Sequence, residues 1–134
     1  LRPTAVQDVT SQGATVKYMI MMFGSAAEMT ETQSPEWITE MIGFMRDLDK
    51  ELTEAGEMVF NEGLQDGDSA KVVRLVDGVP VATDGPFAES KESLIGFWVL
   101  DVADEARILE IAGRIVKYSG LVEVRPVGVA PDVA

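Results

Sequence analysis

Cysteine and histidine are both absent from this sequence of 134 residues. Without cysteine the chain has no disulfide, no thiolate metal site and no cysteine nucleophile. Without histidine it lacks the commonest general base at neutral pH and the commonest metal ligand. Any chemistry must therefore use acidic, basic, hydroxyl or tyrosine side chains, or a bound cofactor.

Positive charge is scarce as well, with 11 lysines and arginines against 23 acidic residues and a net charge of −12. A negative field disfavours nucleic acids and anionic membrane surfaces, because both require basic patches. The same field repels anionic substrates unless a local arginine or lysine compensates for it. Acidity of this kind also keeps proteins in solution, which is the simpler interpretation.

Long apolar runs are missing, and none approaches the ~18 residues of a membrane span. The sequence also has no basic segment followed by an apolar one, so no secretory signal is visible. Hydrophobic residues nevertheless make up 46% of the chain, enough for the core of one domain. We expect a tail or tag remnant over residues 1–15, the domain over residues 16–127 and a C-terminal tail over residues 128–134.

Two segments predict helices. Ser34 can cap a helix that begins at Pro35 and ends before Gly56, with an apolar stripe at spacings of three and four. Asp104 can cap a second helix that ends at Gly120. The expected buried side of the second helix comprises Ile108, Leu109, Ala112, Ile115 and Val116.

Strand patterns flank and separate these helices. Val16–Phe23 and Leu94–Val102 are apolar on both alternating faces, which is typical of central strands. Asp77-Gly78 joins two β-rich runs in the pattern of a type I′ hairpin. The remaining expected segments are a polar loop at Gly24–Gln33 and strands at Glu57–Leu64 and Leu121–Val127.

The resulting order is strand, helix, strand, hairpin, strand, helix, strand. This order predicts the α+β class and, within it, a ferredoxin-like fold, which is a split βαβ arrangement with an inserted β-hairpin here. Both helices would lie on one face of an antiparallel sheet. The two-sided apolar strands require cover on the other face, and no segment of the chain is left for it. We therefore expect a homodimer that packs its sheet faces together.

The stretch TDGPFAESKESLIGFW, residues 83–98, concentrates turn-forming and charged residues before an apolar strand. Asp84, at the start of Asp-Gly-Pro-Phe, is compatible with a tight turn in which its side chain accepts backbone amides. It is also a candidate catalytic base, since a desolvated carboxylate can exchange protons near neutral pH. Phe87 would be an apolar wall of the same pocket or an ordinary core residue.

Charged residues complete the candidate substrate-binding set. Glu89 and Lys91 share a face only if their segment is extended. Glu62 lies at a strand end, and Arg74 is either on the outer face of the hairpin or in a cleft, where it would hold a carboxylate or enolate. A solvated surface charge is the simpler interpretation of each. A hard cation held by Glu62, Asp84 and Glu89 is a further option, but we expect a site without metal or cofactor.

Three strings, VKYMIMMFG, NEGLQ and TDGPFAESKESLIGFWVLDV, together resemble the DGPF branch of the YCII-related family of small bacterial proteins. The resemblance covers roughly residues 16–127, and DGPFAE-K is a specific motif. It implies a cytoplasmic protein with a dimeric α+β barrel built on the ferredoxin-like fold. Most members have no established activity. Some relatives look enzymatic and use a His/Asp pair, which this chain cannot retain because it has no histidine.

Functions of different classes fit these observations. The first is an enzyme in which Asp84 moves a proton on a small acid-like or cyclic substrate, while Arg74 or Lys91 holds developing negative charge. The alternative is a non-catalytic regulatory module that binds a metabolite or a partner. The resemblance implies that the partner is a sigma factor, because members often lie beside extracytoplasmic-function sigma factors. A dimer without any ligand is the third option.

Overall fold

The computed structural model describes residues 14–86 and 93–130, and the α+β class is confirmed. The four-stranded sheet is antiparallel, in the order β3-β6-β2-β7, and β4 and β5 form a separate hairpin. The described strands form an open sheet rather than a closed barrel. The elements are β2 (Val16–Phe23), α1 (Ala26–Thr32), α2 (Pro35–Glu54), β3 (Met58–Gly63), η2 (Gly67–Ser69), β4 (Lys71–Val76), β5 (Val79–Asp84), β6 (Leu94–Val102), α3 (Glu105–Ser119) and β7 (Val122–Pro126).

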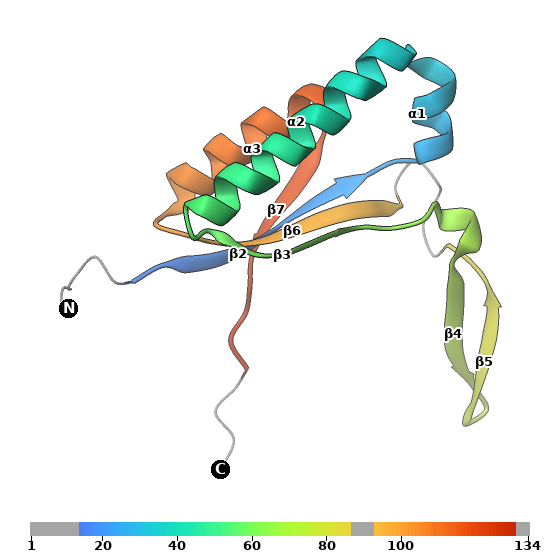
Figure 1. Ribbon diagram of the computed structural model, residues 1–134. Helices are drawn as coiled ribbons and strands as arrows, with labels where there is room; N and C mark the ends of the chain where they lie inside the picture. Colours follow the sequence, from blue (N-terminus) through green and yellow to red (C-terminus); the bar gives the residue numbers. More distant parts are fainter. Residues whose placement is uncertain (1–13, 87–92, 131–134) are drawn as a thin grey trace.

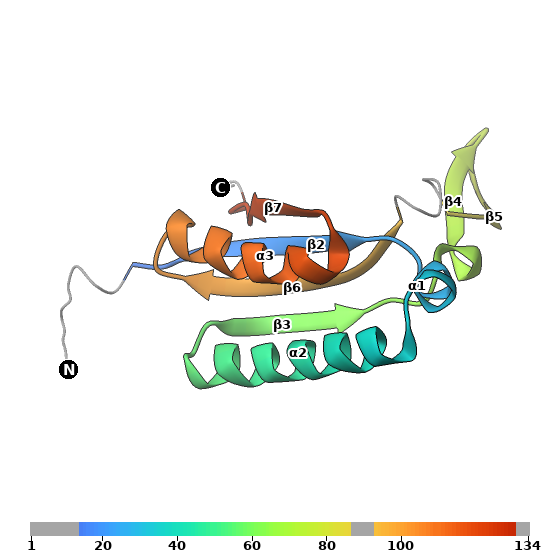
Figure 2. The same cartoon turned by 90° about the horizontal axis from the view of Figure 1, so that it is seen from above.

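Each long helix connects two strands that are not neighbours. The chain leaves β2, passes through α1 and α2 and returns as β3, with β6 between these two strands. It leaves β6, passes through α3 and returns as β7, with β2 in between. The two long helices lie side by side on one face of the sheet, with α2 along β3 and α3 over the other three strands (Figures 1 and 2).

The core fills the space between this face and the helices. Ile20 and Leu100 from the central strands are fully buried, as are Leu48 and Leu52 of α2. From α3 the buried residues are Ile108, Ile111, Ala112 and Ile115, which recur at spacings of three and four. Such spacing places them on one side of a helix, so the sequence pattern and the packing agree.

The helix ends confirm the predicted capping residues. The Ser34 hydroxyl accepts a hydrogen bond from the Trp37 amide at 3.1 Å, and the Asp104 carboxylate accepts one from the Arg107 amide at 2.9 Å. Gly120 ends α3 in the left-handed region with φ 76°. Glycine adopts this conformation without the steric cost that a Cβ adds.

Two expectations from the sequence are wrong. The segment Gly24–Gln33 is not a polar loop throughout, because Ala26–Thr32 forms α1 with Ser25 as its cap. The helix was overlooked because it is short and has no buried residue and therefore no apolar stripe. In α3 the buried side includes Ile111, whereas Leu109 is 51% exposed. The true stripe is rotated relative to the predicted one, since a step of one residue turns a helix by about 100°.

The hairpin of β4 and β5 projects from one end of the sheet, toward the side opposite the helices (Figure 1). Asp77 and Gly78 have φ 49° and 79°, and two positive φ values are what a type I′ turn requires. The prediction of this turn is confirmed. Apolar residues remain exposed on the hairpin, including Val73 at 65% and Leu75 at 73%.

The second sheet face carries apolar side chains without helical cover. Alternation along the strands puts Met19 of β2, Val99 of β6 and Phe60 of β3 in one row on this face. Met21 of β2 and Phe97 of β6 lie in the next row. The rings of Phe60 and Phe97 lie 5.9 Å apart, and Phe60 is half exposed. We call these five residues the open sheet face.

Candidate functional site

Asp84 is the last residue of β5 and lies opposite Lys71, the first residue of β4. Lys71 Nζ donates to Asp84 Oδ1 at 2.5 Å, and the two side chains are 66% and 87% exposed. Pairs this exposed contribute at most about 1 kcal/mol to stability. In the described part of the chain, then, Asp84 forms a solvated ion pair at the base of the hairpin. No sequence pattern identifies Lys71 as its partner, because the pairing depends on hairpin register.

Other predicted site residues lie at different places. Arg74 lies opposite Val81 in the middle of the exposed hairpin, so it is remote from the turn at Asp84. Phe87, Glu89 and Lys91 lie outside the described residues. Glu62 is near the end of β3, at the rim of a separate cavity between α2 and the sheet. The described residues therefore do not bring Glu62, Arg74 and Asp84 together.

A recess lies at the base of the hairpin, directly after Asp84. Its volume is about 590 Å³, and we call it the hairpin-base recess. Phe23, Leu64 and Leu94 contribute apolar walls, while Gln65 and Ser69 contribute polar groups. These residues come from the ends of β2, β3 and β6 and from η2, so strands that are distant in sequence form one pocket.

Gly67 makes the closest approach inside this recess. A Cβ placed there would lie 2.7 Å from Ser93 Oγ and 3.0 Å from Pro86 Cγ. The first distance is too short for two non-bonded atoms, so any side chain at Gly67 forces Ser93 or Pro86 to move. The adjoining Gly85 amide donates to the Ala70 carbonyl at 2.9 Å, and the Gly85–Pro86 peptide bond is cis. The turn after Asp84 is thus one wall of the recess.

Asp66 fixes the wall on the opposite side. Its two carboxylate oxygens accept the Ala26 amide at 2.7 Å and the Ala27 amide at 3.0 Å, at the start of α1. These two backbone hydrogen bonds hold the pKa of Asp66 below its ordinary value of 3.8. Sequence reasoning missed both Asp66 and α1. The signal was the pair Ser25 and Glu28, which has the spacing of a capping box.

A second cavity, of about 210 Å³, lies between α2 and the ends of β3 and β6. Met22, Met41 and Met45 line it together with Trp98, and we call it the α2 cavity. At its polar side the Asn61 amide donates to Asp49 Oδ1 at 3.0 Å. Glu62 also lines this cavity. Because Glu62 pairs with Phe97, its side chain lies on the open sheet face, and its role as a binding residue stays a prediction.

A third, smaller cavity of about 160 Å³ joins the other two regions. It shares Phe23 with the hairpin-base recess and Met22 with the α2 cavity. Trp37 and Tyr118 pack edge to face here, with ring centres 5.5 Å apart. The Tyr118 hydroxyl donates to Glu40 at 2.8 Å, and this bond raises the pKa of Tyr118. The three cavities therefore cluster at one end of the sheet.

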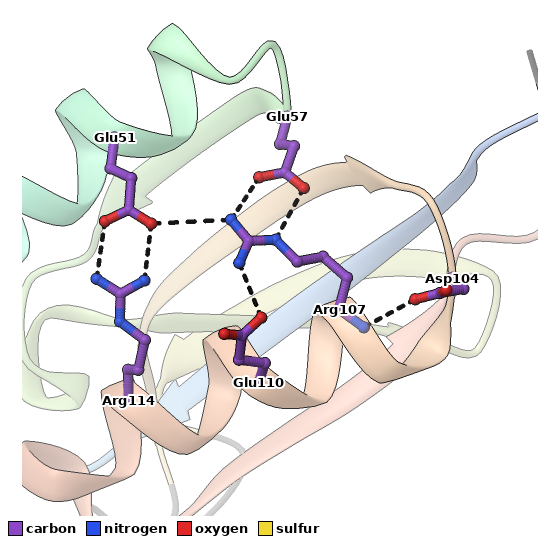
Figure 3. Close-up of polar contacts among 6 residues, drawn as sticks. All are labelled: Glu51, Glu57, Asp104, Arg107, Glu110 and Arg114. Carbon is purple, nitrogen blue, oxygen red and sulfur yellow. Dashed lines mark hydrogen bonds and ion pairs between the residues drawn. The ribbon is translucent and has the colours of Figure 1, made fainter. Parts of the chain in front are cut away.

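The strongest cluster of charges lies at the other end of β3 and has a structural role (Figure 3). Arg107 of α3 makes two hydrogen bonds to Glu57, at 2.8 and 2.9 Å, and a third to Glu110. Arg114 pairs with both oxygens of Glu51 on α2. These hydrogen bonds raise the pKa of both arginines, and the bond from Arg114 lowers the pKa of Glu51. The cluster ties α2 and β3 to α3.

Two features bear on cofactors and membranes. Among the described residues, no three acidic side chains gather as ligands for a metal ion. Glu89, one of the three carboxylates considered for a hard cation, lies outside those residues. In the same part of the chain, every helix is too short or too polar to cross a bilayer.

Comparison with known proteins gives one family. Residues 16–129 match the model of the YCII-related domain. The chain is also similar to an uncharacterized protein of Rhizobium meliloti (strain 1021), with 35% identity over 88 residues. The aligned part covers 61% of this chain and 71% of that protein. Because that relative is uncharacterized, the similarity supports family membership but does not indicate a substrate.

Proposed function

Because this chain belongs to the YCII-related domain family, we propose that it is a dimeric small-molecule-binding protein whose ligand occupies the hairpin-base recess. The single observation that carries the proposal is a recess of about 590 Å³ directly against the turn after Asp84. This volume lies within the ~300–1,000 Å³ of ordinary ligand pockets. Apolar walls with a few polar groups are also the usual composition of such pockets.

The chemistry at the rim favours a small cyclic or acid-like ligand. Phe23 and Leu64 offer surface to an apolar ring, while Gln65 and Ser69 offer hydrogen bonds. Lys71 stands beside Asp84 at the base of the hairpin, so one cation and one carboxylate are close to an anionic or polar group of the ligand. In this proposal Lys71 holds negative charge, the role given to Arg74 or Lys91 from the sequence.

Dimerisation completes the proposal. Two-sided apolar strands and five apolar residues on the open sheet face favour cover by a second copy. The exposed hairpin, with Val73 and Leu75, extends on the same side of the sheet (Figure 1). In a two-fold dimer this arm would reach over the partner and remove Asp84 from water. A desolvated carboxylate is the form that acid/base chemistry requires.

We also propose a finer fold, family branch, location and partner for this chain. The strand order β3-β6-β2-β7, with both long helices on one face, supports the ferredoxin-like fold. Asp-Gly-Pro-Phe at Asp84–Phe87 supports the DGPF branch. A cytoplasmic location and a regulatory link to a sigma factor are expectations from that branch. Recovery of a sigma factor with the purified dimer would make the regulatory module the better description.

The experiment is a thermal-shift titration with small cyclic carboxylic acids and their esters, on the wild type and on Gly67→Ala. The added Cβ moves Ser93 or Pro86 and reshapes the recess, so we expect at least a tenfold loss of affinity. Gly113→Ala is the matched control, because a Cβ there meets nothing within 4 Å. If no compound gives a saturable shift, or if Gly67→Ala binds like the control, the recess is not the site.

Asp84→Asn separates catalysis from binding. The substitution removes the charge but keeps the size of the side chain, so ligand affinity should change little if Asp84 only moves protons. Turnover of any compound that the wild type converts should then disappear, with the melting temperature nearly unchanged. Unchanged turnover would leave Asp84 as a turn residue and the protein as a binding module.

A further inference from the structure

Trp98 has a buried polar group without a partner. The residue lies in the middle of β6 and is 5% exposed. Its indole Nε1–H is buried and makes no hydrogen bond within the part of the chain that the structure describes. A buried indole N–H usually finds an acceptor, and leaving such a donor unpaired costs about 1–3 kcal/mol. The group therefore suits an acceptor that the chain itself does not provide.

The α2 cavity, which Trp98 lines, has room for such an acceptor. Two glycines, Gly63 and Gly96, lie opposite each other in neighbouring strands and leave the floor without side chains. A Cβ at Gly96 would reach ordinary contact, 3.6 Å from the Met22 methyl and from the Glu62 carbonyl oxygen. At ~30 Å³ per water molecule, a volume of 210 Å³ corresponds to about seven waters or one small organic molecule.

The lining of the cavity restricts the class of molecule. Met41 and Met45 on α2, with Met22, present flexible thioether side chains that adapt to aromatic or aliphatic groups. The polar side holds the Asp49 carboxylate beside the Asn61 amide, and none of the described lining residues is basic. The Asp49 carboxylate would therefore repel an anionic ligand, whereas an N–H or O–H group on the ligand can donate a hydrogen bond to it.

We propose that the α2 cavity is a second ligand site, for a small uncharged molecule that carries a carbonyl-type acceptor and an N–H or O–H donor. The acceptor takes the orphaned Trp98 indole N–H, and the donor binds the Asp49 carboxylate. The methionines cover the apolar part of the molecule. This site shares no lining residue with the hairpin-base recess, so it does not depend on the function proposed above.

The probe pair for the test is benzamide and benzoate, which have the same shape. Benzamide offers a neutral carbonyl and an amide donor, while benzoate is anionic. The chain has two tryptophans, so Trp37→Phe leaves Trp98 as the single indole to observe by NMR and fluorescence. We expect benzamide to shift the Trp98 indole N–H resonance in a saturable way. Benzoate should bind at least tenfold more weakly.

Two variants in the Trp37→Phe background test the geometry. Gly96→Ala adds a methyl to the floor of the cavity and should weaken benzamide binding at least tenfold. Gly67→Ala alters only the hairpin-base recess and should bind benzamide like the parent. No saturable shift of the Trp98 resonance, equal binding of benzoate, or unchanged affinity in Gly96→Ala would each overturn the proposal.

A charge variant keeps the test decisive if Gly96→Ala does not fold. Asp49→Asn is nearly isosteric and removes the carboxylate that excludes anions. In this variant the ratio of the benzoate Kd to the benzamide Kd should fall at least threefold. A preference that stays the same would show that Asp49 does not face the bound molecule, and the assignment of the site would be wrong.

Discussion

Asp66 connects two segments that lie forty residues apart. Its carboxylate replaces the hydrogen-bonding partners that the first amides of α1 lack, and Ser25 caps the same helix end. Because α1 has no buried residue, apolar packing contributes little to holding it, and these polar contacts help to keep it in place. The same contacts hold η2 beside α1 and so shape the hairpin-base recess.

Asp66→Asn should lower the melting temperature at neutral pH. The amide keeps one acceptor oxygen but loses the second acceptor and the charge. The folded-state pKa of Asp66 lies below 3.8, so its stabilising contribution is complete above that pH. The contribution disappears as pH falls through the folded-state pKa, and the two proteins should then melt alike.

The control for this comparison is Asp68→Asn, an exposed acid in η2 that changes the net charge equally. Thermal melts of both variants and the wild type from pH 7 down to pH 2.5 supply the measurement. A difference between the wild type and Asp66→Asn that does not depend on pH would rule out the charged hydrogen bonds as its source.

Individual site residues could be proposed from the sequence only where the signal is local. Glu62 was proposed from its place at a strand end, and its role in binding stays a prediction. Asp66 and Lys71 were missed, because their partners lie on other elements. The orphaned N–H of Trp98 is also invisible in the sequence, since a Trp in an apolar strand is expected to be plain core. Whether a polar group has a hydrogen-bond partner depends on the side chains packed around it.

At the scale of elements, sequence signals were reliable where a backbone conformation demands a particular residue. Ser34 and Asp104 cap their helices, and Asp77-Gly78 forms the turn, as predicted. The sequence determines less well which side of a helix is buried. Leu109 and Ile111 are both apolar, and only packing decides which one is buried. Residue type alone cannot make that choice.

Gly113 inside α3 and Gly120 at its C-terminal cap should respond to the same substitution in opposite ways. Gly120→Ala introduces a Cβ at φ 76°, where it costs roughly 1 kcal/mol of stability. Gly113→Ala lies in the exposed helix interior with nothing within 4 Å, and it should stabilise by about 0.5–1 kcal/mol through higher helix propensity. Urea unfolding of both variants gives the comparison.

The sign of each effect is the decisive result. If both variants lose stability, the interior of α3 is more crowded around Gly113 than its open surroundings indicate. If both gain stability, the left-handed cap at Gly120 is not maintained in solution. The m-value should stay the same in all three proteins, since neither change alters the surface buried on folding.

For the whole molecule, one sheet face carries the two long helices (Figure 1). The strand register puts apolar side chains on the other face, and Phe60 is half exposed there. Leaving such a face in water forgoes about 25 cal/mol for each Å² of apolar surface that could be buried. Large exposed patches on small proteins usually mark an interface. The net charge of −12 opposes association over long distances, so apolar burial and local pairing must outweigh it.

Phe60→Asp should break the proposed dimer, whereas Leu109→Asp should not. Both residues are 51% exposed apolar residues, but Phe60 lies on the open sheet face and Leu109 on α3. In a two-fold interface each substitution occurs twice, and two losses of about 2 kcal/mol weaken association roughly a thousandfold. Light scattering at micromolar concentration should give twice the protomer mass for the wild type and Leu109→Asp, and one protomer mass for Phe60→Asp. A monomeric wild type, or a dimer that survives Phe60→Asp, would exclude the open sheet face as the interface and leave Asp84 in solvent.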